Sequence, residues 1–122
     1  VLKDLVARPR PFESSELYAD WWRFVGSPAE DGFSFPSGHM TAAAAAMCAW
    51  MVLRRSAKAT AAGLVVILAM GVARCYLMAH YPSDVLAGCL VGALSAVVAV
   101  VVTDAARRRW RRYRVKATMP HS

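Results

Sequence analysis

Acidic residues are scarce in this chain: 8 Asp and Glu stand against 15 Lys and Arg, and charged residues make up only 19% of its 122 positions. Hydrophobic residues account for 57%, compared with roughly 45–50% in a soluble domain. This composition excludes a disordered chain and argues against an ordinary soluble globule. The chain also begins with valine instead of methionine, so we expect an N-terminal truncation, and the lack of a leader peptide excludes nothing.

Cysteine is also rare, and its spacing does not suit a metal site. The three cysteines, Cys48, Cys75 and Cys89, form an odd set, and two of them lie inside apolar runs. We interpret them as small buried hydrophobic residues and not as a disulfide framework.

Three apolar runs, residues 40–53, 59–73 and 85–103, dominate the rest of the chain. They predict an all-α fold, a polytopic transmembrane helical bundle with three spans. Only the third run, with 19 uncharged residues, matches the roughly 20 residues that cross a bilayer. The first two are shorter, so they either gain a turn from flanking residues or are buried helices of a soluble protein.

Proline and charge set the limits of the other segments, and we expect one membrane domain over residues 1–122. Pro9 and Pro11 should end a helix that precedes the bundle. The predicted segments are 1–11, the end of that helix; 12–38, an outer loop; 39–55, 58–74 and 83–104, the spans; and 105–122, a basic cytoplasmic tail.

The positive charges lie mostly on one side of this bundle. If all three runs cross, the loop at residues 54–58 and the tail share a side with ten cations and one anion. The other side holds five cations and seven anions. Because positive charge marks the cytoplasmic face, residues 1–39 and 74–84 should face outward. A basic run that abuts an apolar span indicates contact with anionic lipid headgroups, and we expect no nucleic-acid partner.

Two local patterns each predict a contact surface without indicating what that surface contacts. Gly88 and Gly92 form G-x-x-x-G, with Ser95 a turn further on, which indicates a closely packed helix face within the chain or between subunits. Trp21 and Trp22 either lie at the headgroup level of the membrane or pack onto the rest of the protein. The sequence does not indicate an oligomeric state.

The outward side collects an unusual set of polar residues. Each has an ordinary structural explanation, such as a cation at a helix end. Together they supply three cations, two imidazoles, one carboxylate and a Ser-Gly pair, which is what a phosphoryl group requires. The set is Lys3, Arg10, Ser37, Gly38, His39, Arg74, His80 and Asp84.

Two short motifs within this set predict specific geometry. Pro-Ser-Gly-His, which ends at His39, opens an apolar run, so its free backbone N–H groups should favour an anion. Asp84 follows His80 by four positions, close enough to accept its ring N–H and hold one tautomer. The simpler alternative is a His–Asp pair that only ties a loop to a helix.

These residues resemble the three motifs of the type-2 phosphatidic acid phosphatase family, whose relatives include vanadium-dependent haloperoxidases and bacterial class A acid phosphatases. K-x6-R-P matches Lys3, Arg10 and Pro11, and P-S-G-H matches residues 36–39 without a change. S-R-x5-H-x3-D matches from Arg74 to Asp84, except that Ala73 replaces the leading serine and removes a hydroxyl. The membrane branch usually has about six spans, so the chain resembles the C-terminal half of such a protein.

The resemblance implies a role for each residue. His80 would be the nucleophile that forms a phosphohistidine, Asp84 would orient it, and His39 would protonate the leaving group and later activate water. The phosphoryl oxygens would be held by Lys3, Arg10, Ser37, Gly38 and Arg74. The family needs no metal ion or cofactor, and no carboxylate cluster converges on the motif residues.

We therefore expect a membrane phosphatase that acts on a lipid phosphate or pyrophosphate at the outer face of the cell membrane. Candidate substrates are phosphatidic acid, phosphatidylglycerol phosphate and a polyprenyl carrier such as undecaprenyl pyrophosphate. Vanadate, a phosphate mimic, should inhibit it. The alternatives are a lipid phosphotransferase and a non-catalytic lipid-binding or scaffold protein. A haloperoxidase fits less well because those relatives are soluble.

Overall fold

The computed structural model describes residues 2–26 and 31–118, and all regular secondary structure in these ranges is α-helical. This confirms the predicted all-α class. The helices are α1 (Leu2–Val6), α2 (Pro11–Ser14), α3 (Glu16–Phe24), α4 (Gly38–Arg54), α5 (Ala57–Tyr76) and α6 (Pro82–Thr118).

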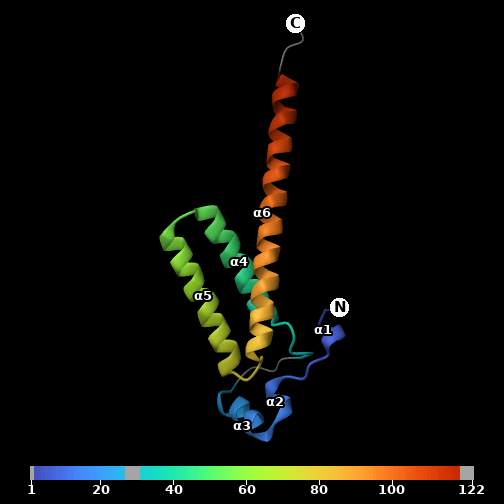
Figure 1. Ribbon diagram of the computed structural model, residues 1–122, viewed down its shortest axis with the longest axis vertical. Coiled ribbons are helices and arrows are strands. Elements are labelled where there is room, and N and C mark those ends of the chain that lie inside the picture. Colours follow the sequence, from blue (N-terminus) through green and yellow to red (C-terminus); the bar gives the residue numbers. More distant parts are fainter. Residues whose placement is uncertain (1, 27–30, 119–122) are drawn as a thin grey trace.

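Helices α4 and α5 form a hairpin, and α6 runs alongside them and projects beyond their turn (Figure 1). The turn needs only two residues. Arg55 ends α4 in the left-handed conformation, with φ of 48°, and the Ser56 side chain caps α5 by accepting a hydrogen bond from the Ala59 N–H at 3.2 Å. Helix α4 packs against both α5 and α6 and is therefore the centre of the bundle.

The G-x-x-x-G face of α6 packs on α4 within the chain. A Cβ atom at Gly88 would lie 2.6 Å from the Ser37 carbonyl oxygen, and one at Gly92 would lie 2.8 Å from the Ala44 Cβ. Only glycine allows the two backbones to approach this closely. The closely packed helix face is therefore confirmed, and its partner is α4.

Two of the three predicted spans are long and apolar enough to cross a membrane, namely those in α5 and α6. In each, only 22% of the apolar window is buried, which is unlike the core helix of a soluble protein. Helix α4 has 17 residues, about 25 Å at 1.5 Å per residue, so the span at 39–55 stays a prediction. The large apolar side chains exposed on α5 and α6 include Leu64, Val65, Leu68, Val72, Leu86, Leu90, Leu94, Val97, Val98, Val101 and Val102.

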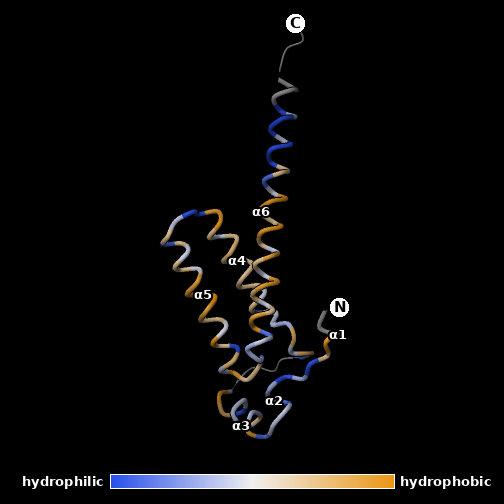
Figure 2. The backbone as a smooth tube through the Cα atoms, in the orientation of Figure 1, coloured by the Kyte–Doolittle hydropathy of each residue, from blue (hydrophilic) through white to orange (hydrophobic). Residues whose placement is uncertain are grey.

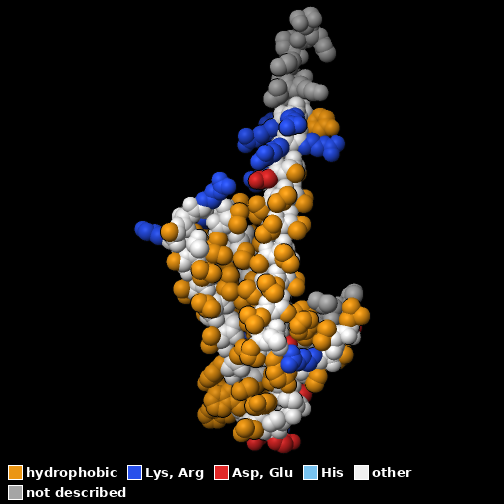
Figure 3. Space-filling model, viewed as in Figure 1, with side chains coloured by type: hydrophobic (Ala, Val, Ile, Leu, Met, Phe, Trp, Pro, Cys, Tyr) orange, Lys and Arg blue, Asp and Glu red, His pale blue; other side chains and the backbone are white. Residues whose placement is uncertain are grey.

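The basic residues gather at one end of the bundle. Hydrophilic positions mark the α4–α5 turn and the upper part of α6 (Figure 2), and Lys and Arg side chains cluster there, whereas acidic side chains lie at the opposite tip (Figure 3). The prediction that the loop at residues 54–58 and the basic segment share one side is therefore confirmed.

The structure corrects three predicted segments. Residues 12–38 are not simply a loop, because they contain α3 and most of α2. The basic segment continues α6 through Thr118, since Ala and Arg are strong helix formers and extend a helix that already exists. The leading helix ends at Val6, before Pro9, and not at the prolines. The Lys3 and Lys116 side chains, Glu30 and residues 119–122 lie outside the described part of the chain.

Candidate functional site

The candidate site lies at the end of the bundle opposite the basic residues, where three distant stretches of chain meet. It is distinguished by polar side chains that are buried although the protein is small. Burial of so many polar groups is costly unless they hold one another or a ligand. Each of these residues is at most 8% exposed: Arg10, Ser34, Ser37, Arg74, His80 and Asp84.

Arg10 ties the loops of the site together. It lies in extended backbone before Pro11, with φ of −76° and ψ of 156°, as expected for a residue that precedes proline. Its guanidinium donates hydrogen bonds to the carbonyl oxygens of Gly32 at 3.0 Å, Asp31 at 3.1 Å and Ala79 at 3.1 Å. Its Nη1 also lies 3.4 Å from Nε2 of His80. Arg10 therefore holds the loop at residues 31–32, which precedes the second motif, against the third motif.

The contacts of His80 define its tautomer. Arginine only donates hydrogen bonds, so Nε2, which faces Arg10, must be the acceptor nitrogen. Nδ1 then carries the proton and donates to the Ser34 carbonyl oxygen at 2.7 Å. Burial, followed by the charge of Arg10, lowers the pKa of His80 to about 4, against a smaller opposing effect of the Ser34 hydrogen bond. His80 is therefore neutral at pH 7, with a lone pair on Nε2.

Asp84 does not accept the ring N–H of His80, so that expectation was wrong. Its Oδ1 pairs with Nη1 of Arg8 at 2.8 Å, and its Oδ2 accepts from the Ser34 hydroxyl and from the Tyr81 N–H at 3.0 Å. The reason is local, since Asp84 lies in the first turn of α6 and its carboxylate reaches back to the residue that precedes the helix. Ser34 lies between Asp84 and His80, and its hydroxyl oxygen is 3.4 Å from Nδ1 of His80.

Sequence reasoning missed Arg8 and Ser34. Arg8 donates to the Ser83 hydroxyl at 2.7 Å, pairs with Asp84, and lies over the Tyr81 ring at 4.0 Å from its centroid. The Ser34 N–H donates to the Arg8 carbonyl oxygen at 2.8 Å, so the two residues are also joined to each other. One signal was available: Arg8, like Arg10, precedes a proline and so lies in the same segment that cannot be helical.

The predicted helix N-terminus at the Pro-Ser-Gly-His motif is confirmed, and α4 begins at Gly38, one residue before the predicted span at 39–55. Ser37 is the N-cap of α4 and accepts a hydrogen bond from the Met40 N–H at 3.4 Å. Its own N–H donates to the Asp84 carbonyl oxygen at 3.1 Å, which joins the second motif to the third. Gly38 and His39 follow at the exposed rim of the site. The His39 side chain forms no hydrogen bond, ion pair or ring contact with the residues that the structure describes, and its backbone is part of α4.

Arg74 is the second buried arginine of the candidate site, besides Arg10. It lies in the last turn of α5 and is 8% exposed, and its carbonyl oxygen accepts a hydrogen bond from the His80 N–H at 3.3 Å. Its positive charge contributes to the low pKa of His80. The structure thus brings Arg10, Ser37, Arg74, His80 and Asp84 together. It places Gly38 and His39 at the rim, and of Lys3 it describes only the position in α1. In residues 2–26 and 31–118, no group of three or more His, Cys, Asp or Glu side chains could hold a metal ion.

Comparison with known proteins gives two matches. The sequence profile of the PAP2 superfamily matches residues 1–108. The chain is also 32% identical over 105 residues to lipid A 1-phosphatase of Rhizobium johnstonii, a match that covers 84% of this chain and 41% of the relative. The chain therefore spans less than half the length of that curated relative. No solved structure matches it.

Proposed function

Because the chain belongs to the PAP2 superfamily, we propose that it is part of an integral membrane phosphatase that hydrolyses a lipid phosphate or pyrophosphate through a phosphohistidine. The observation that carries the proposal is the state of His80, a neutral imidazole with an unprotonated Nε2 beside a buried arginine. A lone pair next to fixed positive charge suits attack on a phosphoryl group, which carries negative charge on its oxygens.

The proposed reaction has two steps. In the first, the lone pair of His80 Nε2 attacks phosphorus, the bond from phosphorus to the leaving oxygen breaks, and His39 gives that oxygen a proton. In the second, His39 takes a proton from water, whose oxygen attacks phosphorus, and the P–N bond electrons return to Nε2. The exposed position of His39 at the start of α4 gives it access to water.

The cations and the helix start would hold the phosphoryl oxygens while charge builds up. Arg10 and Arg74 are buried and present fixed guanidinium groups, and Lys3 would supply a third charge. The backbone N–H groups at the start of α4, including that of Gly38, favour an anion at the same end. These groups do the work of charge stabilisation, so we propose that no metal ion takes part.

The substrate class follows from the surroundings of the site. The site lies at one end of helices whose exposed surfaces are apolar, which suits a substrate anchored by a hydrocarbon chain. The Rhizobium relative is named for a phosphatase of lipid A, so a lipid A 1-phosphate joins the three lipids considered above as a substrate to be tested. Positive charge at the opposite end favours an extracytoplasmic site and a cytoplasmic end for α6.

The test is phosphate release by the full-length protein in proteoliposomes that contain each of the four lipids, with EDTA present. We expect release that vanadate inhibits and that His80→Ala abolishes. The exposed-surface variant Ser95→Ala is the matched control and should keep its activity. Release that requires added magnesium, or that persists in His80→Ala, would refute the mechanism. Transfer of phosphate to a second lipid would indicate a phosphotransferase, and absence of turnover on all four lipids would favour a lipid-binding role.

A further inference from the structure

Helix α3 is amphipathic, although it lies in a region that the sequence predicted to be a loop. Leu17, Trp21 and Phe24 follow one another at helical spacing and form an apolar edge. Glu16, Asp20 and Arg23 form a charged edge about 100° around the helix from the apolar one, and Asp20 and Arg23 pair there at 2.9 Å. A helix with one apolar edge requires an apolar partner along that edge.

The position of α3 against the bundle is set by its tryptophans. The Trp21 indole N–H donates to the Tyr76 carbonyl oxygen at 2.8 Å, and the two rings meet edge to face with centroids 5.4 Å apart. Trp22 stacks on Phe12 at 4.2 Å. Both tryptophans therefore pack onto the protein, and Trp21 fixes α3 at the C-terminal end of the membrane-length helix α5.

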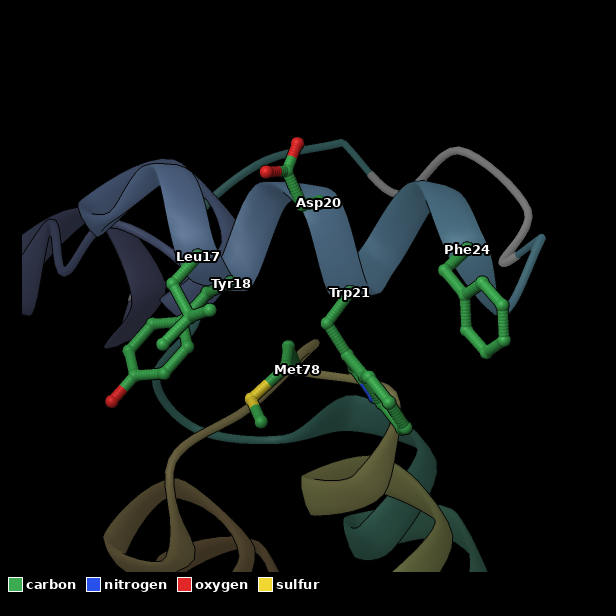
Figure 4. A pocket seen from close by; sticks show the side chains of 6 residues that line it. All are labelled: Leu17, Tyr18, Asp20, Trp21, Phe24 and Met78. Carbon is green, nitrogen blue, oxygen red and sulfur yellow. The ribbon is translucent and has the colours of Figure 1, made fainter.

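The apolar edge overhangs an open groove. Leu17, Tyr18, Trp21 and Phe24 project from the side of α3 on which Met78 lies, whereas Asp20 projects from the other side (Figure 4). The groove has a volume of about 510 Å³ and is lined by these six residues. Leu17 is 74% exposed and Phe24 is 81% exposed, so the structure leaves this edge without protein cover from the described residues.

We propose that α3 lies in the membrane interface and that acyl chains of the bilayer lipids fill this groove. The first support is continuity: the hydrophobic surface of α5 continues over α3 toward the acidic tip (Figure 3), and Tyr76, which Trp21 contacts, is 57% exposed on that surface. The second is direction, because the apolar edge lies on the side of α3 that faces the α5 end of the bundle, while the Asp20 carboxylate projects from the other side. Large tilted aromatic residues at a membrane boundary suit this position.

The position of α3 in the interface also has a consequence for the reaction. This consequence rests on the proposed function. Met78 lines the groove and lies two positions before His80, and its carbonyl oxygen accepts a hydrogen bond from the Phe12 N–H at 3.3 Å. Anchoring α3 in the interface therefore places the His80 loop at the depth of the lipid headgroups. A phosphate at that depth reaches Nε2 without leaving the membrane.

The experiment measures lipid contact at α3 directly and does not depend on turnover. Single cysteines replace Leu17, Phe24 or, as a control on the charged edge that does not line the groove, Arg23, in full-length protein that lacks its native cysteines. Each is labelled with bimane in phosphatidylcholine vesicles, and quenching by lipids brominated on the acyl chains is compared with quenching by aqueous iodide. We expect brominated lipids to quench the labels at 17 and 24 several-fold more than the label at 23, and iodide to show the reverse order.

Two outcomes would overturn the proposal. Equal iodide quenching at all three positions would place α3 in water. Protection of positions 17 and 24 from both quenchers would show that another protein segment or a second copy covers the groove. Substitution of Phe24 removes a ring contact with Trp21. Substitution of Leu17 removes no ring contact, so it tests the same edge of α3 without that loss. Helix content from circular dichroism establishes that each variant is folded.

Discussion

The carbonyl oxygen of Ser34 lies 2.7 Å from Nδ1 of His80, where a carboxylate was expected. The Ser34 hydroxyl donates to Asp84, so the carboxylate acts on the imidazole through Ser34 and not directly. This makes Ser34 and Asp84 positioning residues, and it makes the backbone at residue 34 the group that selects the tautomer.

Ser34→Ala should keep the carbonyl contact and remove the link to Asp84. Loss of one buried hydrogen bond costs about 1–1.5 kcal/mol, so phosphoenzyme formation should slow by on the order of tenfold. KM should change little because Ser34 does not hold the phosphate. Single-turnover kinetics checks this, with Ser95→Ala on the exposed face of α6 as control. An unchanged rate, or a loss confined to KM, would contradict the role of Ser34.

The two motif histidines should fail in different ways. His80→Ala should form no phosphoenzyme, because the attacking nitrogen is gone. His39→Ala should still form it from p-nitrophenyl phosphate, whose good leaving group needs less protonation, but should release phosphate slowly. Rapid-quench trapping of acid-labile phosphohistidine distinguishes the two. Phosphohistidine trapped in His80→Ala, or absent from His39→Ala with this ester, would reverse the assignment.

Stability should depend on pH through His80. Its pKa is about 4 in the folded protein and about 6.5 when unfolded, so between these values the unfolded state binds more protons. The free energy of unfolding should therefore rise with pH across this window and fall on acidification. We expect Tm in detergent to drop between pH 7 and pH 4.5 by more in the wild type than in His80→Asn. The control variant His39→Gln, altered at an exposed site, should show the same dependence of Tm on pH as the wild type. Parallel curves of Tm against pH for the wild type and His80→Asn would contradict the low pKa of His80.

Gly88→Ala should disturb the site from outside it. The new Cβ would lie 2.6 Å from the Ser37 carbonyl oxygen, so α6 must move away from the start of α4. Overpacking of this kind typically costs about 1–3 kcal/mol, and it should lower both Tm and activity. Ala99→Val adds more volume at an exposed position of α6 and should have little effect on either. Equal Tm values for the two variants would show that the α4–α6 contact is not close.

The orientation of the bundle can be checked with an impermeant maleimide in intact cells. Single cysteines at Glu16 and Lys58, both exposed, report the two ends. Glu16→Cys should react from outside and Lys58→Cys only after permeabilisation, because the basic end should be cytoplasmic. The opposite pattern would invert the topology, and reaction of both from outside would mean that α5 does not cross the membrane.

Local patterns in the sequence were sufficient for the apolar helices of the bundle and for the identity of most site residues, but not for α3 or the basic end of α6. Apolar runs predicted α5 and the apolar part of α6, and Pro-Ser-Gly-His predicted the N-terminus of α4, whose N-cap is Ser37. Charge placement predicted that the α4–α5 turn and the basic part of α6 share one end. These features depend on neighbours within a few positions, which a single sequence displays directly.

Tertiary structure alone decided how the site residues face one another. Ser34 and His80 are 46 positions apart, and Arg8 and Asp84 are 76 apart, so no local spacing relates them. The Ser34 carbonyl oxygen accepts from the imidazole and the Ser34 hydroxyl donates to Asp84, and only the folded chain brings these three residues together. The sequence by itself therefore determined which chemical groups are present and on which helices they lie. Packing determined which atoms meet, because burial of polar groups is tolerated only where each finds a partner.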